Sequence, residues 1–524
     1  MRITLLLLVL LAPQDEWKVE ARDVQIPMRD GKSLAADLFL PPKAGKYPVV
    51  LIQTPYNKKG LGKPIGSKDA TSNETGRGSI SDALGLLDRD NYVYCVVDWR
   101  GFFASKGAME GVDPKQWKRG QDGYDCVEWL ASQAWSNGKI GMWGGSALGK
   151  QQLDTCAEHP PHLVCAVPLI ASMGSTYDGY YEGGVLLESH VDKLDQLGFG
   201  VGKRVKESPL PSAPIWKYAE RMTYRPETIE VPCLLITGWW DNFPDLIIKT
   251  FDDLGAKARP GSKLLIGPWD HVSIGIVEQG DWKFEKAAKM SADAAKAFFD
   301  FWLRDQKNGW DKTARVRYWT VNEEAWSDAE EWAKIKRSTR TLHLNPDGAI
   351  AVEAKKGTRV LAGDPRKPTP TLGGANLPPV KHGPTSQAEL DGRKDVLVYA
   401  MKLTSPLRVN GNVEISLPFA SNRADFTICA RLCDVGSDGK PILIADAAKR
   451  ARLETGKTMT LRFSVTATTW PAGHELRIYL STSNWPRYGR NPNTGADHWD
   501  EKTAVDVEIT IEHEKAELRV PVVE

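Results

Sequence analysis

Short apolar runs alternate with helical patterns over the first 170 residues of this chain. The segments 33–40, 48–52 and 92–97 are rich in Val, Leu, Ile and Tyr, and polar or turn residues bound each of them. Such runs are typical of strands buried on both faces. The segment 122–133 has the spacing of a helix. Because strands and helices alternate, the region predicts a parallel sheet covered by helices on both faces.

This rhythm stops between residues 172 and 230 and then returns. The interrupting segment is rich in Gly, Tyr and Leu and has a helical patch at 185–197, so it predicts a helical cap insertion over the sheet. Further strands are expected at 232–238 and 262–267, followed by a helix at 292–304. We therefore assign residues 21–171 and 231–315 to one α/β domain.

From residue 316 onwards the pattern changes to a period of two. The segments 413–417, 476–480 and 505–511 alternate apolar and polar residues, with turn residues between such runs. This pattern predicts an all-β C-terminal domain over residues 316–524. Within it, the stretch 357–393 is rich in Pro, Gly and Lys, and we expect a long surface loop there.

The chain begins with Arg2 and an apolar run over residues 3–11, which resembles a short secretory signal without a clear cleavage site. We interpret residues 1–20 as a signal segment, which favours a secreted or periplasmic protein over a cytoplasmic one. An apolar N-terminal strand is the alternative. No other segment is long enough to span a bilayer.

Composition narrows the classes of partner. The 524 residues include 68 basic and 67 acidic ones without a basic block, so nucleic acid is not an expected partner. Seven cysteines lack C-x-x-C spacing, which indicates neither a structural zinc nor a disulfide framework. Nineteen tryptophans suggest aromatic surfaces as well as an aromatic core. The composition is compatible with a homo-oligomer.

The most informative segment is Gly144-Gly145-Ser146-Ala147-Leu148-Gly149, which follows a short apolar run and precedes a helical pattern. Glycines beside a serine at a strand-to-helix turn are typical of a nucleophile whose hydroxyl stands at the end of a sheet. Two other interpretations fit the segment. The serine could cap the helix, or the loop could bind phosphate, although Gln151 replaces the Ser or Thr that such a loop requires.

A nucleophilic serine needs a histidine base and an orienting carboxylate. In α/β-hydrolases the acid follows the serine along the chain, and the histidine follows the acid. The two later strands run into suitable residues, Asp241 and His271. Asp270 is a rival acid, but it directly precedes His271 and should point the other way. His159 and His162 flank two prolines and indicate a surface turn rather than a metal site.

These residues belong to a longer series of motifs that resembles the CocE/NonD family of α/β-hydrolases, which includes X-Pro dipeptidyl-peptidases, glutaryl-acylases and α-amino-acid ester hydrolases. The resemblance covers nearly the whole chain. Besides the serine turn, its motifs are Met28-Arg29-Asp30-Gly31, Thr54-Pro55-Tyr56, Asp98-Trp99-Arg100-Gly101, Ser105-Lys106-Gly107, Trp135-Ser136-Asn137-Gly138-Lys139, Gly238-Trp239-Trp240-Asp241, Gly267-Pro268-Trp269-Asp270-His271 and Arg490-Asn491-Pro492-Asn493-Thr494-Gly495.

The resemblance implies an α/β-hydrolase domain with a helical cap, a C-terminal jelly-roll-like domain and the catalytic triad Ser146, Asp241 and His271. It also implies an oxyanion hole made by the Tyr56 hydroxyl and the N–H of Ala147, where family members usually carry Tyr. Asp98 and Arg100 sit near the site in the family, and we expect them to have a structural ion-pairing role. The implied reaction proceeds through an acyl-enzyme and needs neither metal nor organic cofactor.

The substrate is expected to be a small ester or amide, or a short peptide. Relatives that bind a substrate ammonium carry carboxylates two and three residues after the triad acid, but here these positions are Phe243 and Pro244. Aromatic residues suggest an apolar acyl pocket instead, lined by Trp239, Trp240, Phe243 and Trp269. A carboxylesterase or acylase is therefore favoured over an X-Pro dipeptidyl-peptidase. The third hypothesis is a non-catalytic carbohydrate-binding protein on a retired hydrolase scaffold.

Overall fold

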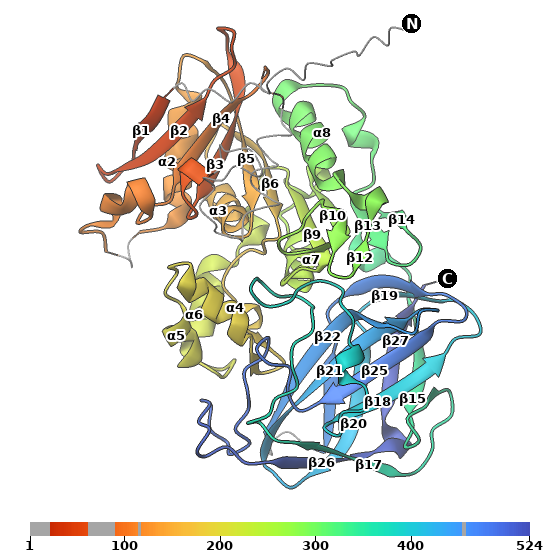
Figure 1. Ribbon diagram of the computed structural model, residues 1–524. Helices are drawn as coiled ribbons and strands as arrows, with labels where there is room; N and C mark the ends of the chain where they lie inside the picture. Colours follow the sequence, from red (N-terminus) through yellow and green to blue (C-terminus); the bar gives the residue numbers. More distant parts are fainter. Residues whose placement is uncertain (1–20, 61–87, 89, 114–116, 453–456, 524) are drawn as a thin grey trace, which may run out of the picture.

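The computed structural model describes residues 21–60, 88, 90–113, 117–452 and 457–523 of the chain (Figure 1). The proposed signal segment, residues 1–20, lies outside the described residues. Within the ranges described, no helix is both long and apolar enough to cross a bilayer.

A ten-stranded sheet organises the part of the chain that precedes residue 330, in the order β1-β2-β4-β3-β5-β6-β9-β10-β13-β14. The strands from β4 to β13 in this order are parallel, whereas β1, β2 and β14 pair antiparallel with their neighbours. The ten strands are β1 (Ala21–Pro27), β2 (Ser33–Phe39), β3 (Tyr47–Thr54), β4 (Val93–Asp98), β5 (Ser136–Gly145), β6 (Leu163–Leu169), β9 (Leu234–Trp240), β10 (Lys263–Asp270), β13 (Val316–Thr320) and β14 (Ala325–Ala329).

Helices cover both faces of this sheet, which is why its central strands are apolar at consecutive positions. Residues of α2 (Arg119–Ala131), α3 (Ala147–Cys156) and α7 (Pro244–Asp252) belong to the core on one face. On the other face lies α8 (Met290–Arg304), with Phe298, Phe299 and Leu303 packed against the sheet. The predicted α/β-hydrolase fold is confirmed.

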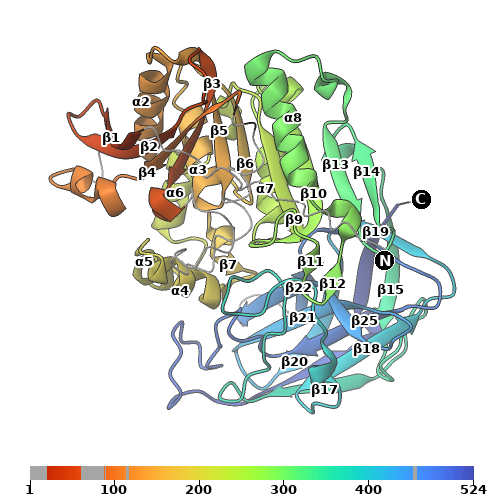
Figure 2. The same ribbon diagram turned by 45° about the horizontal axis from the view of Figure 1, so that its top comes forward.

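Between β6 and β9 the chain leaves the sheet and forms the cap. It contains the hairpin of β7 (Tyr181–Glu182) and β8 (Val185–Leu186), then α4 (Glu188–Gln196), α5 (Gly202–Lys206) and α6 (Pro214–Thr223). Both views show the cap helices between the end of the ten-stranded sheet and the C-terminal strands (Figures 1 and 2). The N–H of Arg450 in the C-terminal part donates to Gly183 O in the hairpin, which joins the cap to that part.

The C-terminal part consists of a nine-stranded and a four-stranded antiparallel sheet, as expected for a jelly-roll-like domain. The nine-stranded sheet contains β15 (Ser338–Leu344), β16 (Ile350–Ala351), β17 (Thr358–Gly363), β19 (Leu407–Gly411), β20 (Glu414–Ser421), β23 (Thr458–Arg462), β24 (Thr466–Trp470), β26 (Val507–Glu512) and β27 (Glu517–Val522). The four-stranded sheet contains β18 (Val396–Lys402), β21 (Asp425–Val435), β22 (Pro441–Arg452) and β25 (Glu475–Ser481). We refer to this part as the β domain.

Two sequence predictions about the C-terminal half are wrong. The β domain does not start at residue 316, because β13 pairs in parallel with β10 and β14 folds back on β13, so both extend the hydrolase sheet. The stretch 357–393 is not only a surface loop. It contains β17 and buried side chains such as Leu372, Gln387 and Leu390. Both errors arise from long-range pairing, which local composition does not encode.

Candidate active site

Ser146 stands at the turn between β5 and α3 with a backbone φ of 56° and ψ of −120°. Non-glycine residues rarely adopt positive φ, and such strain is typical of nucleophiles at this position. A Cβ on Gly144 would lie 2.6 Å from Leu148 Cβ, and one on Gly149 would lie 2.5 Å from Ala171 Cβ. The N–H of Ser146 donates to Leu169 O at 2.9 Å and fixes the turn against β6.

Three side chains from three strand ends form one hydrogen-bonded series. His271 Nε2 lies 3.0 Å from Ser146 Oγ, and His271 Nδ1 lies 2.6 Å from Asp241 Oδ1. His271 follows β10, Asp241 follows β9, and both are buried. A proton on Nδ1 donates to the carboxylate, which leaves the Nε2 lone pair facing the serine hydroxyl. The geometry is that of a nucleophile, a base and an orienting acid.

The Asp241 carboxylate has further donors that fix its position. Thr237 Oγ1 donates to Oδ2 at 2.7 Å, and the N–H of Asn242 donates to Oδ1 at 2.6 Å. With His271 as the third donor, each oxygen of the buried carboxylate is hydrogen-bonded. The carboxylate is thereby oriented toward the imidazole.

Asp270, the rival acid, points away from this series. Its carboxylate accepts the N–H groups of Val272 and Ser273, and its Oδ2 lies 2.6 Å from His382 Nδ1. His382 belongs to the β domain and was not singled out from the sequence, since no local pattern connects it to a residue 112 positions earlier.

Tyr56 lies beside the serine. Burial raises the pKa of Tyr56, while hydrogen bonds with the Ser146 side chain and the Ala147 N–H act in the opposite direction. The phenol is therefore protonated at neutral pH and able to donate. Its hydroxyl and the Ala147 N–H converge beside Ser146 Oγ, where an oxyanion would form during attack on a carbonyl.

One wall beside the triad is formed by Phe243 and the cap residue His190. The Phe243 ring meets the rings of His271 and His190 edge to face, with centroids 6.0 and 5.3 Å away. Asn242 Nδ2 lies 3.2 Å from His190 Nδ1. Burial lowers the pKa of His190 to about 3, and the positive charges of Lys150 and Arg487 act in the same direction. His190 is thus a neutral imidazole next to the triad, which the sequence analysis did not predict.

Three of the four predicted pocket residues lie elsewhere. Trp239 Nε1 donates to Trp319 O, Trp240 Nε1 donates to Leu443 O, and the Trp269 ring packs against Trp326. All three are almost completely buried in the core. The prediction that Trp239, Trp240 and Trp269 line the acyl pocket is therefore wrong, and only Phe243 lies beside the triad. Aromatic side chains bury large apolar areas, and these three rings contribute to core packing.

The motif residues Asp98 and Arg100 do not pair with each other. Arg100 binds the carboxylates of Asp122 and Asp30 at 2.7 and 2.9 Å. Asp98 accepts the N–H of Lys58 at 2.7 Å. These contacts fix the chain after β4 and β3. The expected ion-pairing role is confirmed for Arg100, whereas it is wrong for Asp98, whose carboxylate accepts backbone N–H groups of Lys58 and Ala104.

The loop after β5 does not present a lysine to a phosphate. Lys150 Nζ donates to Gly174 O at 2.6 Å, and burial lowers the pKa of Lys150 to about 8. The lysine is directed to the cap segment, which removes the basis of the phosphate-loop interpretation.

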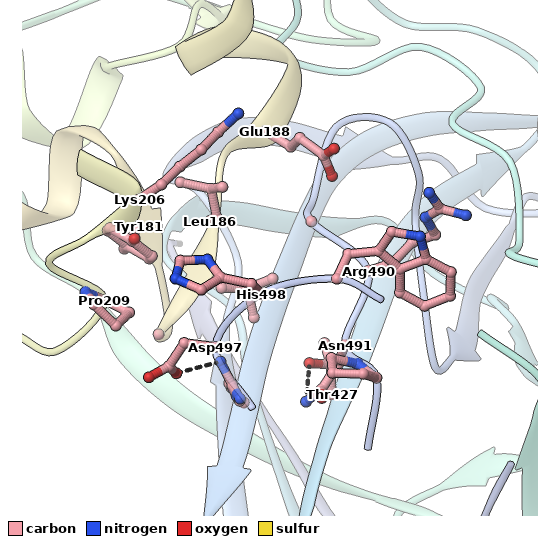
Figure 3. A pocket seen from close by; sticks show the side chains of 16 residues that line it. Tyr181, Leu186, Glu188, Lys206, Pro209, Thr427, Arg490, Asn491, Asp497 and His498 are labelled. Carbon is pink, nitrogen blue, oxygen red and sulfur yellow. Dashed lines mark hydrogen bonds and ion pairs between the residues drawn. The ribbon is translucent and has the colours of Figure 1, made fainter. Parts of the chain in front are cut away.

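A separate pocket of about 250 Å³ lies between the cap and the β domain, and Figure 3 shows the side chains that line it. Glu188 and Lys206 come from the cap, while Asn491 and His498 come from the β domain. Arg490 of the Arg490–Gly495 motif lies flat on Trp499, with its guanidinium carbon 3.9 Å from the ring centroid. None of the lining residues belongs to the series of Ser146, His271 and Asp241.

Comparisons with known proteins agree with this architecture. The family model described as X-Pro dipeptidyl-peptidase (S15 family) matches residues 30–213 and 210–273, and that of the X-Pro dipeptidyl-peptidase C-terminal non-catalytic domain matches residues 308–519. A cocaine esterase of Rhodococcus sp. is 28% identical over 553 residues, covering 91% of this chain and 92% of that protein. A putative serine esterase of Mycobacterium bovis is 22% identical, covering 81% and 80%.

Two solved structures share the fold over nearly the whole length. An aminopeptidase from a marine sediment archaeon, Thaumarchaeota archaeon, superposes with a TM-score of 0.80 at 19% identity, covering 97% of both chains. An α-amino acid ester hydrolase superposes with a TM-score of 0.79 at 21% identity, covering 96% of both chains.

Proposed function

The chain belongs to the CocE/NonD family of α/β-hydrolases, related to the X-Pro dipeptidyl-peptidases, and is a serine hydrolase of the esterase or X-Pro peptidase type; from this premise we propose that it is a carboxylesterase or acylase that acts through Ser146, His271 and Asp241. The observation that carries the proposal is the continuous series of hydrogen bonds, 3.0 and 2.6 Å long, through the two nitrogens of one imidazole. A structural serine has no need of an oriented base.

In the proposed mechanism, Ser146 Oγ attacks the carbonyl carbon of an ester or amide while its proton passes to His271 Nε2. Asp241 stabilises the imidazolium through the Nδ1–H. The Tyr56 hydroxyl and the Ala147 N–H donate to the tetrahedral oxyanion. The Nε2 proton then goes to the leaving alcohol or amine. A water molecule, deprotonated by His271, attacks the acyl-enzyme, the acid is released, and the proton returns to Ser146.

The surroundings of the triad favour an acyl group without positive charge. Phe243 and Pro244 occupy the positions where ammonium-binding relatives carry carboxylates. The neutral ring of His190 lies next to Phe243, and positive charges on Lys150 and Arg487 act on that ring. A substrate ammonium placed beside Phe243 would meet apolar surface, which disfavours a charged group.

An X-Pro dipeptidyl-peptidase is the second candidate, because both matching family models carry that name. Such an enzyme must bind the free amino group of its peptide. Comparing kcat/KM for p-nitrophenyl butyrate with that for glycyl-prolyl-p-nitroanilide separates the two candidates. We expect the ester to be hydrolysed with the higher kcat/KM, and a higher value for the anilide would reverse the order.

The catalytic proposal is tested by labelling with a fluorophosphonate probe and identifying the modified residue by mass spectrometry. We expect the label on Ser146, and its loss together with ester hydrolysis in Ser146→Ala. Ser132→Ala, at an exposed serine on the end of α2, is the control and should retain both. Full ester hydrolysis by Ser146→Ala would refute the triad, and absence of labelling in the wild-type protein would favour the non-catalytic carbohydrate-binding hypothesis.

A further inference from the structure

Asp270 and His382 form a buried contact between the hydrolase sheet and the β domain. His382 Nδ1 lies 2.6 Å from Asp270 Oδ2, and the Asp270 side chain has no exposed surface, while that of His382 is 27% exposed. Neither residue takes part in the proposed mechanism. A fully buried carboxylate is costly unless its lone pairs are bonded. Loss of His382 would therefore leave Asp270 Oδ2 buried without this hydrogen bond.

The Asp270 carboxylate shapes the turn that carries His271. Its Oδ1 accepts the N–H of Val272 at 2.9 Å and that of Ser273 at 2.8 Å, so the chain turns around it directly after the histidine. The N–H of Asp270 itself donates to Gln279 Oε1 at 2.9 Å. His382 binds the remaining oxygen of the same carboxylate. The orientation of His271 is thus linked through one residue to a side chain of the β domain.

The backbone segments beside the Asp270–His382 contact are closely packed against each other. A Cβ on Gly280 would lie 2.4 Å from Pro384 O, and one on Gly383 would lie 3.0 Å from Gly280 N. The N–H of Asp281 donates to Pro384 O at 2.8 Å, and the N–H of Ser386 donates to Asp281 Oδ2 at 2.7 Å. Two segments far apart in sequence are therefore packed backbone to backbone beside the histidine turn.

The same region of the β domain also contacts the strand that ends at the triad acid. The N–H of Leu443 on β22 donates to Thr385 O at 3.0 Å, and Leu443 O accepts the indole N–H of Trp240 at 3.2 Å. Trp240 directly precedes Asp241. One strand of the β domain is thereby connected to the segments that present both the acid and the histidine.

We propose that Asp270 and His382 are positioning residues, through which the β domain fixes the orientation of His271 toward Ser146 and Asp241. The inference rests on the proposed function, because it assigns the two residues a role only if His271 is the base. Small displacements of a base from its nucleophile are expensive in rate, on the order of 100-fold per ångström. A contact that fixes the turn therefore affects kcat more than KM.

Charge strengthens the contact in the acidic and neutral range. The hydrogen bond with Asp270 raises the pKa of His382, so the pair is ionic below that raised value and loses its charge as the pH rises through it. The other charged groups around His382 are Glu278 and Asp281 on the hydrolase side and Lys381 and Glu389 on its own loop. Glu278 is paired with Lys283 and Glu389 with Lys381, and the charge that raises the pKa of His382 is that of Asp270.

The β domain offers a matched control pair. His474 Nδ1 lies 2.9 Å from Asp434 Oδ1, with side-chain exposures of 27% and 3%, nearly the same as in the Asp270–His382 contact. This pair lies where β21 meets β25, and it does not touch the segment that carries His271. His474→Leu therefore removes an equivalent histidine–carboxylate contact without affecting the proposed site.

The experiment measures kcat and KM for p-nitrophenyl butyrate between pH 6 and 9 in the full-length wild type, His382→Leu, Asp270→Asn, the double variant and His474→Leu. We expect about a tenfold lower kcat in His382→Leu, with KM changed less than twofold. The ratio of wild-type to variant kcat should fall as the pH rises. The kcat of the double variant should be no lower than that of the more impaired single variant, because both substitutions break the same contact. His474→Leu should keep wild-type kcat.

Circular dichroism melting separates loss of fold from loss of orientation. If His382→Leu fails to fold, His382→Asn, which keeps a donor at the Nδ1 position, is used, and its kcat should lie between those of wild type and Asp270→Asn. A kcat for the folded His382 variant equal to that of His474→Leu would overturn the proposal. Failure of the proposed function gives a different result, namely no fluorophosphonate label on Ser146 in the wild-type protein.

Discussion

Ser146 presents its hydroxyl from a backbone conformation that most residues avoid, and its neighbours explain how the chain tolerates this. The space that a side chain would need at Gly144 and at Gly149 is occupied by Leu148 and Ala171. The helix therefore starts directly at the serine, with the Ala147 N–H at its first turn. The same compactness that strains the serine supplies an oxyanion donor next to it.

The proposed role of Tyr56 as a donor to the oxyanion depends on its hydroxyl group alone. Tyr56→Phe removes only the hydroxyl beside Ser146 and Ala147. We expect kcat to fall by about 100- to 1,000-fold with KM nearly unchanged, because the lost hydrogen bond strengthens in the transition state. Steady-state kinetics with a p-nitrophenyl ester measure this. Tyr47→Phe removes a hydroxyl bonded to Lys43 O at an exposed site and is the control. Equal kcat in Tyr56→Phe and wild type would exclude Tyr56 from the oxyanion hole.

At the scale of single elements, α3 is connected to the segment after β6 by a half-buried lysine. Lys150 Nζ donates to Gly174 O, and burial lowers the pKa of Lys150 to about 8 from its ordinary 10.5. Between these two values the unfolded chain binds more protons than the folded one. The free energy of unfolding must therefore rise with pH over this range.

Lys150→Met tests this dependence. We expect the stability of the wild type relative to the variant to increase by about 2 kcal/mol between pH 7 and pH 10.5, because the variant has no proton to release. Urea unfolding followed by circular dichroism at several pH values measures the difference. Lys106→Met, at an exposed lysine, is the control. A difference between wild type and Lys150→Met that stays constant with pH would show that burial does not perturb the amine.

Elements with strong local signals could be predicted from the sequence, and those defined by distant partners could not. The helix expected at 122–133 spans Arg119–Ala131, and the one expected at 292–304 spans Met290–Arg304. In contrast, β13 alternates like a β-domain strand but pairs with β10, about 50 residues earlier. Trp240 resembled a pocket residue because Leu443 O, which accepts the hydrogen bond of its indole, is 203 residues away.

The residues of the site also differ in whether local sequence or distant packing defines them. Ser146, Asp241 and His271 could be selected because motif and strand order identify residues at strand ends. His190 and His382 approach the site from the cap and the β domain, and nothing in their neighbouring sequence marks them. Their contribution depends on how separate parts of the chain pack, which single-sequence patterns do not encode.

At the scale of the whole molecule, the hydrolase sheet and the β domain share one core. Buried residues of both, including Trp239, Val321 and Trp470, belong to a single continuous apolar cluster. The N–H of Val321 donates to Ala467 O at 3.0 Å, and the N–H of Thr469 donates to Val321 O at 2.9 Å. Multidomain chains often unfold in separate steps. A shared core of this kind instead couples the two parts, so catalytic geometry and β-domain stability should be lost together.

Trp240→Phe tests this coupling at the contact between the two parts. The change removes the indole donor to Leu443 O and part of a buried ring, which should lower the free energy of unfolding by roughly 1–3 kcal/mol. We expect one calorimetric transition in the wild type and one, at lower temperature, in the variant, with ester hydrolysis lost over the same temperatures. Trp129→Phe on α2, away from the β domain, is the control for removing an indole. Two resolved transitions in the wild type, with hydrolysis following only the first, would show that the β domain is an independent unit and that its contacts with the triad segments do not govern the active site.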